Sequence, residues 1–215
     1  MILAFDGGFF LRHAAPADHA ALCHVCLRTG AAGQDATWRE DDPELMGLIY
    51  AVPYQVLEPD FAFVIEGRKG VAGYLFGALD TGAFNLRVAA DWYPSLRRRI
   101  TDPGADRSRW QGSDWARRMV HHPRLELPAA LAPFPSHGHV DLLPEARGRG
   151  IGKSCMAFLE GRLAAAGSGG IFLEVDPANS HALRFYDSLG YRTVPGVRIA
   201  DASVFVAKRL TRGPD

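Results

Sequence analysis

The clearest hydrophobic pattern lies in the last third of the chain, where apolar runs alternate with segments of helical periodicity. Residues 137–144, HGHVDLLP, form a short apolar run that predicts a strand. The next segment predicts a helix that ends near Gly167, because apolar side chains recur there at the helical period. These side chains are Ile151, Cys155, Phe158, Leu159 and Leu163. Residues 170–176, GIFLEVD, predict a strand of a buried sheet.

A second helix and a closing hairpin complete this pattern. One face of the helix carries Ala182, Phe185, Tyr186 and Leu189, and Gly190 ends it. Two final runs, residues 191–194 and 203–208, have the composition of paired strands. This order of elements predicts an α/β domain built around a mixed central sheet, with helices on both faces.

The first part of the chain predicts further strands and helices. We expect a strand at residues 9–12, followed by a helix that ends at Gly30. A second helix is expected around residues 44–50, with Pro53 as its break. Two β-rich runs within residues 61–80 are joined by Gly-Arg-Lys-Gly, which indicates a hairpin.

Residues 81–135 break the regular pattern. Prolines punctuate short helical pieces that carry Trp92, Trp110 and Trp115. So long a segment with little regular structure usually serves a function, often as a lid or a binding loop. We therefore expect one domain over residues 1–215, with an insertion at about 81–135 that precedes the next strand.

Composition narrows the class of protein. Apolar residues make up 47% of the 215 residues and charged residues 22%, which favours a sizeable core over disorder. Lys plus Arg equals Asp plus Glu at 24 each, so a dedicated nucleic-acid binder is not expected. No apolar run approaches the length of a membrane helix, and the N-terminus lacks the basic start of a signal peptide. Three cysteines are too few for a disulfide framework, so we expect a cytoplasmic protein. We expect it to be a monomer or a homodimer.

The stretch LLPEARGRGIGKS, residues 142–154, carries the main candidate chemistry. Its glycines lie between a strand and the first turn of a helix, where backbone N–H groups lack partners and the helix dipole favours an anion. Arg147 and Arg149 can add charge-assisted bonds to phosphate oxygens. The Walker spacing fails because Arg147 stands where its first glycine belongs, and the Rossmann spacing fails at Lys153.

Arg147-x-x-Gly150-x-Gly152 resembles the Gln/Arg-x-x-Gly-x-Gly/Ala signature of the GNAT N-acetyltransferase superfamily. The strand before the signature, the later LEVDPAN and ALRFYDSLGY, and the early LRHAAPAD resemble that family in the same order. The resemblance implies the GNAT fold, acetyl-CoA as cofactor and an amine as acceptor. Within the superfamily, the chain resembles the subfamily that includes the acetyltransferase-like domain of animal O-GlcNAcase and free-standing bacterial enzymes. The resembling segments are residues 50–80, WYPSLR, GIFLEVDP and RFYDSLGY. The animal domain lacks a recognisable signature, whereas this chain has it entire.

The resemblance also implies roles for particular residues. Leu142 and Leu143 would pair with the pantetheine arm, and Asn179 would lie near it. The pyrophosphate would bind the turn formed by Arg147, Gly148, Arg149, Gly150, Ile151, Gly152 and Lys153. Tyr186 would protonate the departing thiolate. Glu174 is the candidate general base, directly or through water, and Asp141 competes with it.

Other polar clusters suggest the acceptor site. His137, His139 and Asp141 alternate along one strand and share a face. This arrangement could ligate a metal, but a contact of His139 with the acceptor is favoured and no metal is expected. Tyr54 and Trp92 are the aromatic candidates for the same site. Cys23 and Cys26 have redox or zinc half-motif spacing, although a helix would simply bury both on one face.

The expected function is therefore transfer of acetyl from acetyl-CoA to an amine by direct attack in a ternary complex. The alternative is a module that binds acetyl-CoA, or a partner, without turnover. An acyl donor other than acetyl also remains open, since the sequence does not define the volume beside the thioester.

Overall fold

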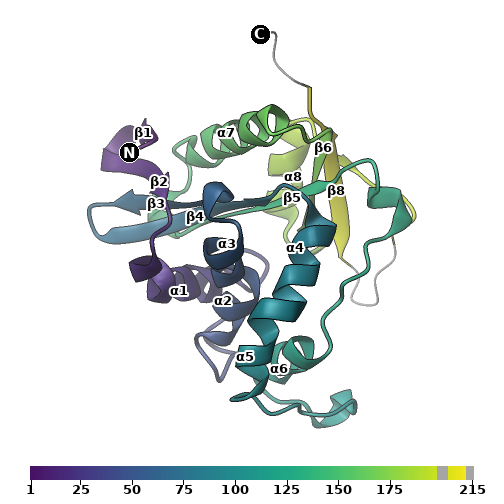
Figure 1. Ribbon diagram of the computed structural model, residues 1–215. Helices are drawn as coiled ribbons and strands as arrows, with labels where there is room; N and C mark the ends of the chain where they lie inside the picture. The colour runs from purple at the N-terminus through teal and green to yellow at the C-terminus, as the bar shows by residue number, and fades with distance from the viewer. Residues whose placement is uncertain (198–202, 212–215) are drawn as a thin grey trace.

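The computed structural model describes residues 1–197 and 203–211, which form a mixed sheet of eight strands in the order β1-β2-β3-β4-β5-β6-β8-β7 (Figure 1). Every neighbouring pair is antiparallel except β5 and β6, which are parallel. The strands are β1 (Leu3–Phe5), β2 (Phe9–His13), β3 (Ala62–Gly67), β4 (Gly70–Ala78), β5 (Ser136–Leu142), β6 (Gly170–Val175), β7 (Arg192–Thr193) and β8 (Val204–Arg209). The sequence predicted all of these strands except β1.

Helices cover both faces of the sheet, as the sequence predicted (Figure 1). One face carries α1 (His19–Thr29), α2 (Leu45–Tyr50), α3 (Val52–Leu57), α4 (Thr81–Arg87), α5 (Tyr93–Arg97) and α6 (Asp114–His121). The other carries α7 (Ile151–Ala165) and α8 (Ser180–Ser188). Strand alternation produces this division: Val64 of β3 packs with the first group, and Phe63 and Ile65 pack with α7. None of the described helices is both long and apolar enough to cross a bilayer.

The helix predicted around residues 44–50 is confirmed as α2, which ends at Tyr50, but Pro53 does not itself break a helix. Pro53 instead stands in the first turn of α3, which begins directly after α2. A first-turn residue needs no backbone N–H for the helix, so proline is accepted there. Because α3 forms, Tyr54, a candidate residue of the acceptor site, packs against one face of the sheet.

The short helical pieces predicted in residues 81–135 are present, but the segment holds more regular structure than the sequence indicated. Helix α4 continues through a π-helical turn (Val88–Trp92) into α5, and α6 follows later. Figure 1 shows this helical segment running from the sheet edge down beside α2 and α3. Pro94 lies in the first turn of α5, where it does not interrupt the helix. The extra residue of the π turn shifts the apolar stripe, which explains why the helical period is hard to detect.

Strands β5 and β6 separate soon after they meet. Only Ser136↔Ile171 and His137↔Phe172 are paired, although β5 continues to Leu142 and β6 to Val175. A 3₁₀ turn (Pro144–Ala146) and the glycine-rich segment then lead from β5 into α7. The fold therefore places an opening in the sheet beside the first turn of a helix.

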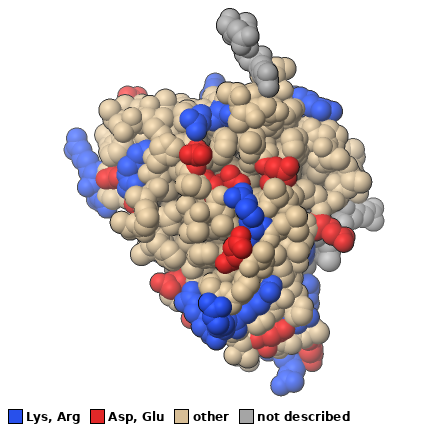
Figure 2. Space-filling view, in the orientation of Figure 1, with Lys and Arg blue, Asp and Glu red and all other residues tan. Residues whose placement is uncertain are grey.

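Charges of both signs are spread over the surface. On the face shown in Figure 2, Lys and Arg side chains alternate with Asp and Glu, and Lys and Arg gather most densely at the lower end, toward α5 and α6. This mixture agrees with the zero formal net charge.

Candidate active site

A narrow cavity of about 110 Å³ occupies the opening between β5 and β6. Its walls come from both strands and from α8, which contributes Ala182 and Tyr186. Asn179 also lines it and caps α8, because its side-chain oxygen accepts from the Ala182 N–H at 3.0 Å. The strand edges at this opening are free of each other, so they are available to an extended ligand.

The glycine-rich turn next to this cavity is built for an anion. Gly148 and Gly150 have φ angles of 70° and 72°, in the left-handed region that favours glycine. Within the described residues, the backbone N–H groups of residues 148–153 donate to no protein acceptor. A Cβ at Gly148 or Gly150 would meet no atom within 4 Å, so the space in front of the turn is open. Free N–H groups at the start of α7 are the donors that a phosphate requires.

The two arginines of the turn serve the protein itself. Arg147 donates from Nε to the Leu142 carbonyl at 2.7 Å and from a terminal nitrogen to the Gly33 carbonyl at 2.9 Å. Arg149 donates to the Glu145 carbonyl at 3.0 Å. The guanidinium of Arg147 therefore ties the turn to the end of β5 and to the loop at Gly33. Lys153 is exposed on the first turn of α7.

A second, larger cavity of about 1100 Å³ lies on the face covered by α1 to α6. It meets the narrow cavity at five shared residues: Gly138, His139, Asp141, Glu174 and Asp176. Three of these, His139, Asp141 and Glu174, are candidate site residues from the sequence. The structure thus brings them together at the junction of the two spaces.

The two carboxylates at the junction have different surroundings. Burial raises the pKa of Asp141, and the neighbouring Tyr74, Arg147 and Thr29 oppose that rise. The Glu174 side chain is exposed to the cavity and accepts no hydrogen bond from the residues that the structure describes. The Glu174 carboxylate is therefore free to accept a hydrogen bond or a proton from a ligand in the cavity.

The two histidines of β5 are also unlike each other. His137 is buried and bonds through both ring nitrogens, to Tyr54 and to Thr81. His139 lines both cavities, and no described side chain or carbonyl bonds to its ring nitrogens. Burial lowers the pKa of His137 to about 3 and that of His139 to about 4, so both rings are neutral near pH 7. In the described part of the chain, no group of three or more His, Cys, Asp or Glu residues is placed to hold a metal.

Aromatic side chains form much of the large cavity. Tyr54 stacks between Phe76, with ring centroids 5.2 Å apart, and Phe84, at 4.5 Å. Trp92 does not belong to this wall: its Nε1 donates to the Leu48 carbonyl at 2.7 Å and docks the insertion on α2. Sequence reasoning kept Trp92 and set aside three residues that do line the cavity, Tyr50, Phe84 and Tyr93. The direction in which each ring points depends on how the helices pack. The local sequence therefore does not distinguish the aromatic residues that line the cavity from those that do not.

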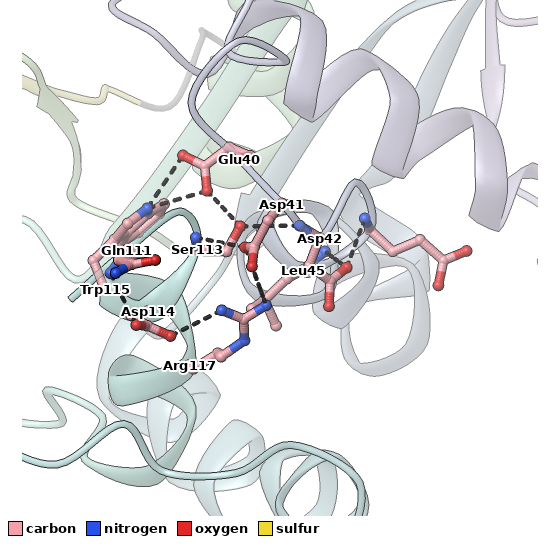
Figure 3. A network of polar contacts seen from close by, with 10 residues as sticks. Glu40, Asp41, Asp42, Leu45, Gln111, Ser113, Asp114, Trp115 and Arg117 are labelled. Carbon is pink, nitrogen blue, oxygen red and sulfur yellow. Dashed lines mark hydrogen bonds and ion pairs between the residues drawn. The ribbon is translucent and has the colours of Figure 1, made fainter. Parts of the chain in front are cut away.

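A polar network joins the insertion to the loop before α2 (Figure 3). Ser113 donates to Glu40 at 2.7 Å, and Trp115 Nε1 donates to both oxygens of the same carboxylate at 3.1 and 3.2 Å. Arg117 donates to both oxygens of Asp41 at 3.0 Å. Glu40 and Trp115 also line the large cavity, so this network holds part of the cavity wall in place.

The cysteines lie in the core. Cys23 and Cys26 are both buried on α1, as the simple helical interpretation of their spacing predicted. Burial raises the pKa of the Cys23 thiol to about 12 and raises that of Cys26 as well. Protonated thiols are poor nucleophiles, although Cys26 lines the large cavity.

Comparisons with solved structures agree with this architecture. The structure of SsHAT superposes with a TM-score of 0.86 at 29% identity, covering 95% of this chain and 100% of SsHAT. The phosphinothricin acetyltransferase of Sinorhizobium meliloti, solved in complex with acetyl-CoA, gives 0.53 at 15% identity over 94% of this chain and 89% of that one. The Salmonella typhimurium acetyltransferase yncA, solved with its cofactor acetyl-CoA, gives 0.53 at 16% identity over 97% of each chain. The sheet, its opening and the glycine turn are thus those of a GNAT fold.

Sequence comparisons identify the family. Residues 129–191 match the acetyltransferase (GNAT) family, and the chain belongs to that family of acetyltransferases. Protein O-GlcNAcase of Rattus norvegicus and that of Mus musculus are each 30% identical over 178 residues, which is 81% of this chain. The chain spans about a fifth, 19%, of the length of these curated relatives. The resemblance to the GNAT superfamily and to the O-GlcNAcase-related subfamily is therefore confirmed.

Proposed function

We propose that this protein transfers the acetyl group of acetyl-CoA to an amine bound in the large cavity, by direct attack in a ternary complex. The observation that carries the proposal is the junction of the two cavities at His139, Asp141 and Glu174. A donor in the narrow cavity and an acceptor in the large one would meet at that junction. Holding two reactants in this way is itself a large part of catalysis.

The residues around the narrow cavity fit acetyl-CoA. The free N–H groups of residues 148–153 would bind the pyrophosphate, and the edge of β5 that leaves β6 after His137 would bind the pantetheine arm. The sequence expected Leu142 and Leu143 to pair with that arm, but the Leu143 N–H donates to Ala72, its carbonyl accepts from Ala146, and the Leu142 carbonyl accepts from Arg147. Asn179 lines the same cavity and would lie beside that arm. When bound, the cofactor supplies an acetyl group activated as a thioester.

Two residues would handle the protons. Glu174, whose carboxylate is open to the junction, takes the proton that the attacking amine must lose, directly or through water. Tyr186 lines the narrow cavity, and burial raises its pKa, so its hydroxyl keeps its proton until negative charge develops on the leaving sulfur.

Direct attack is favoured over an acetyl-enzyme intermediate. The thiol of Cys26, which lines the large cavity, has its pKa raised by burial. It therefore lacks the thiolate character that a nucleophile needs. The acceptor amine would attack without a covalent relay.

Replacing Tyr186 with Phe tests this assignment. We expect kcat to fall by about 10² or more, because the leaving thiolate loses its proton donor, while the affinity for acetyl-CoA measured by calorimetry stays within about twofold. Tyr191→Phe is the matched control, since Tyr191 is equally buried but its hydroxyl donates to Glu160 at 2.9 Å, outside the cavity. An equal loss of cofactor affinity in Tyr186→Phe would contradict the assigned role.

A panel of amines distinguishes an enzyme from a sensor. Lysine peptides, polyamines, aminoglycosides and amino sugars would be offered with acetyl-CoA, and release of free thiol would be followed. We expect slow hydrolysis without an amine and faster thiol release with at least one class. Tight acetyl-CoA binding with no turnover across the panel would instead favour the sensor.

A further inference from the structure

A chain of hydrogen bonds runs through three residues that line the large cavity. Tyr54 comes from α3, His137 from β5 and Thr81 from the first turn of α4. The hydroxyl of Thr81 lies 2.8 Å from the Pro135 carbonyl oxygen and 2.8 Å from His137 Nδ1. His137 Nε2 bonds to the hydroxyl of Tyr54. All three side chains are buried, with exposed fractions of 3–8%.

The chemistry of these groups fixes the direction of every proton. The Pro135 carbonyl can only accept, so the single hydroxyl proton of Thr81 is donated to it. Thr81 must then accept from His137, which places the proton of the neutral imidazole on Nδ1. His137 Nε2 consequently carries a lone pair, and the Tyr54 hydroxyl donates to it. This is the only arrangement in which all three contacts are hydrogen bonds.

The protonation states agree with this arrangement. Burial keeps His137 neutral, with a pKa lowered to about 3, and it raises the pKa of Tyr54, so the phenol keeps its proton. Because that proton is committed to His137, the oxygen of Tyr54 presents only lone pairs to the cavity. Tyr54 stands near the junction, since its ring lies 5.3 Å from that of His139 and the charge of Glu174 acts on it.

An attacking amine needs just such a surface. Its nitrogen lone pair must point at the carbon under attack, so its N–H groups should be bound and no donor should occupy the lone pair. We propose that Tyr54 binds the acceptor amine as an obligate hydrogen-bond acceptor, and that His137 and Thr81 are positioning residues that impose this polarity. The inference rests on the proposed acetyl transfer, but its proton arrangement exists in the free protein.

Thr81→Val is the most informative variant. Valine has nearly the shape of threonine but cannot accept from His137, so an Nδ1–H would be left without a partner. We expect the imidazole to change to the Nε2–H form, which would donate to Tyr54 and turn the tyrosine proton toward the cavity. Thr81→Ser keeps the hydroxyl and should retain the original arrangement.

The tautomer of His137 can be measured in the free protein, without an amine substrate. Long-range ¹H–¹⁵N correlation spectra of histidine-labelled protein, assigned with His137→Gln, should show His137 as Nδ1–H in wild type and Thr81→Ser, and as Nε2–H in Thr81→Val. An Nε2–H or doubly protonated His137 in the wild-type protein at pH 7 would overturn the proposal. This readout stands even if acetyl-CoA fails to bind, so it separates the inference from the proposed function.

Kinetics with the best amine of the panel test the functional half. Tyr54→Phe should raise the KM for that amine about tenfold, the effect of one lost hydrogen bond, with the KM for acetyl-CoA unchanged. Thr81→Val should lower kcat/KM about tenfold or more, and Thr81→Ser should restore it to within about twofold of wild type. Equal melting temperatures of the serine and valine variants would show that folding is not the cause. Wild-type kinetics in both Tyr54→Phe and Thr81→Val would overturn the proposal.

Discussion

At the scale of single residues, two glycines set the conformation of the turn before α7, which we propose binds the pyrophosphate. A left-handed conformation at Gly148 and Gly150 turns successive N–H groups toward the same open space. A side chain at either position would adopt this conformation only with strain and would also fill that space. The turn therefore depends on the absence of a Cβ.

Gly150→Val should weaken acetyl-CoA binding at least tenfold, because the branched side chain strains the turn and occupies the space before the free N–H groups. Titration calorimetry measures the effect. Gly161→Ala is the control, since Gly161 is exposed on the same helix with no atom within 4 Å of a new Cβ. That change should leave affinity intact and stabilise the helix by about 0.5–1 kcal/mol. Unchanged affinity in Gly150→Val would remove the turn from the cofactor site.

Residue-level prediction from sequence succeeded where the backbone decides the outcome. Asp141, His139 and Glu174 follow from their positions along two strands, and the structure places them at the junction. Gly148 and Gly150 follow from the turn before α7, where both have positive φ. It was less successful where a long side chain chooses among partners. Arg147 could reach a phosphate by sequence, yet it bonds to the carbonyls of Leu142 and Gly33, and Gly33 is distant in the chain.

At the scale of elements, the insertion acts as part of the cavity wall because a few polar contacts tie α6 to the loop before α2. Ser113 is fully buried, donates to Glu40 and accepts from the Asp42 N–H at 3.2 Å. A buried hydroxyl with two such bonds is costly to remove, since it leaves a carboxylate oxygen and an N–H short of a partner.

Ser113→Ala should therefore loosen α6 by about 2 kcal/mol. Hydrogen exchange of the α6 amides, compared with amides of β4, measures this local opening. Ser108→Ala is matched to it, because Ser108 also bonds a carboxylate, that of Asp106 at 2.6 Å, but is exposed. Exchange from α6 that is equally slow in both variants would show that the network does not hold the helix.

Helices and strands were predictable from the sequence where apolar residues follow a single spacing, that of a helix or that of a strand. The strands β3 to β6 and the helices α7 and α8 each have a clear apolar face and a glycine or turn at their ends. The insertion was not predictable in this way, since its π turn shifts the stripe and its prolines resemble breaks. β1 was missed because three residues carry too little pattern.

At the scale of the whole molecule, stability should depend on pH through buried His137 and half-buried His139. Their pKa values are lowered to about 3 and about 4, whereas an unfolded histidine titrates near 6.5. Between these values the unfolded chain binds more protons, so the free energy of unfolding falls as pH falls. The raised pKa of Asp141 acts in the opposite direction, but with one proton against two.

Urea titrations from pH 7.5 down to pH 4.5 should show stability lost below about pH 6.5, with a slope of up to about 1.4 kcal/mol per pH unit for each histidine. In His139→Gln one of the two contributions is absent, so the slope should be roughly halved. A free energy of unfolding that stays constant between pH 7 and pH 5 would contradict the burial of neutral His137 and His139.

The early separation of β5 from β6 has one more consequence. In the part of the chain that the structure describes, only two residue pairs of the ladder join strands β1 to β5 to the group β6, β8 and β7. Polar backbone atoms on the facing edges consequently lack the rungs that a continuous sheet would supply. A ligand with amide groups of its own can act as a surrogate strand there, and the protein would gain rigidity from its own cofactor.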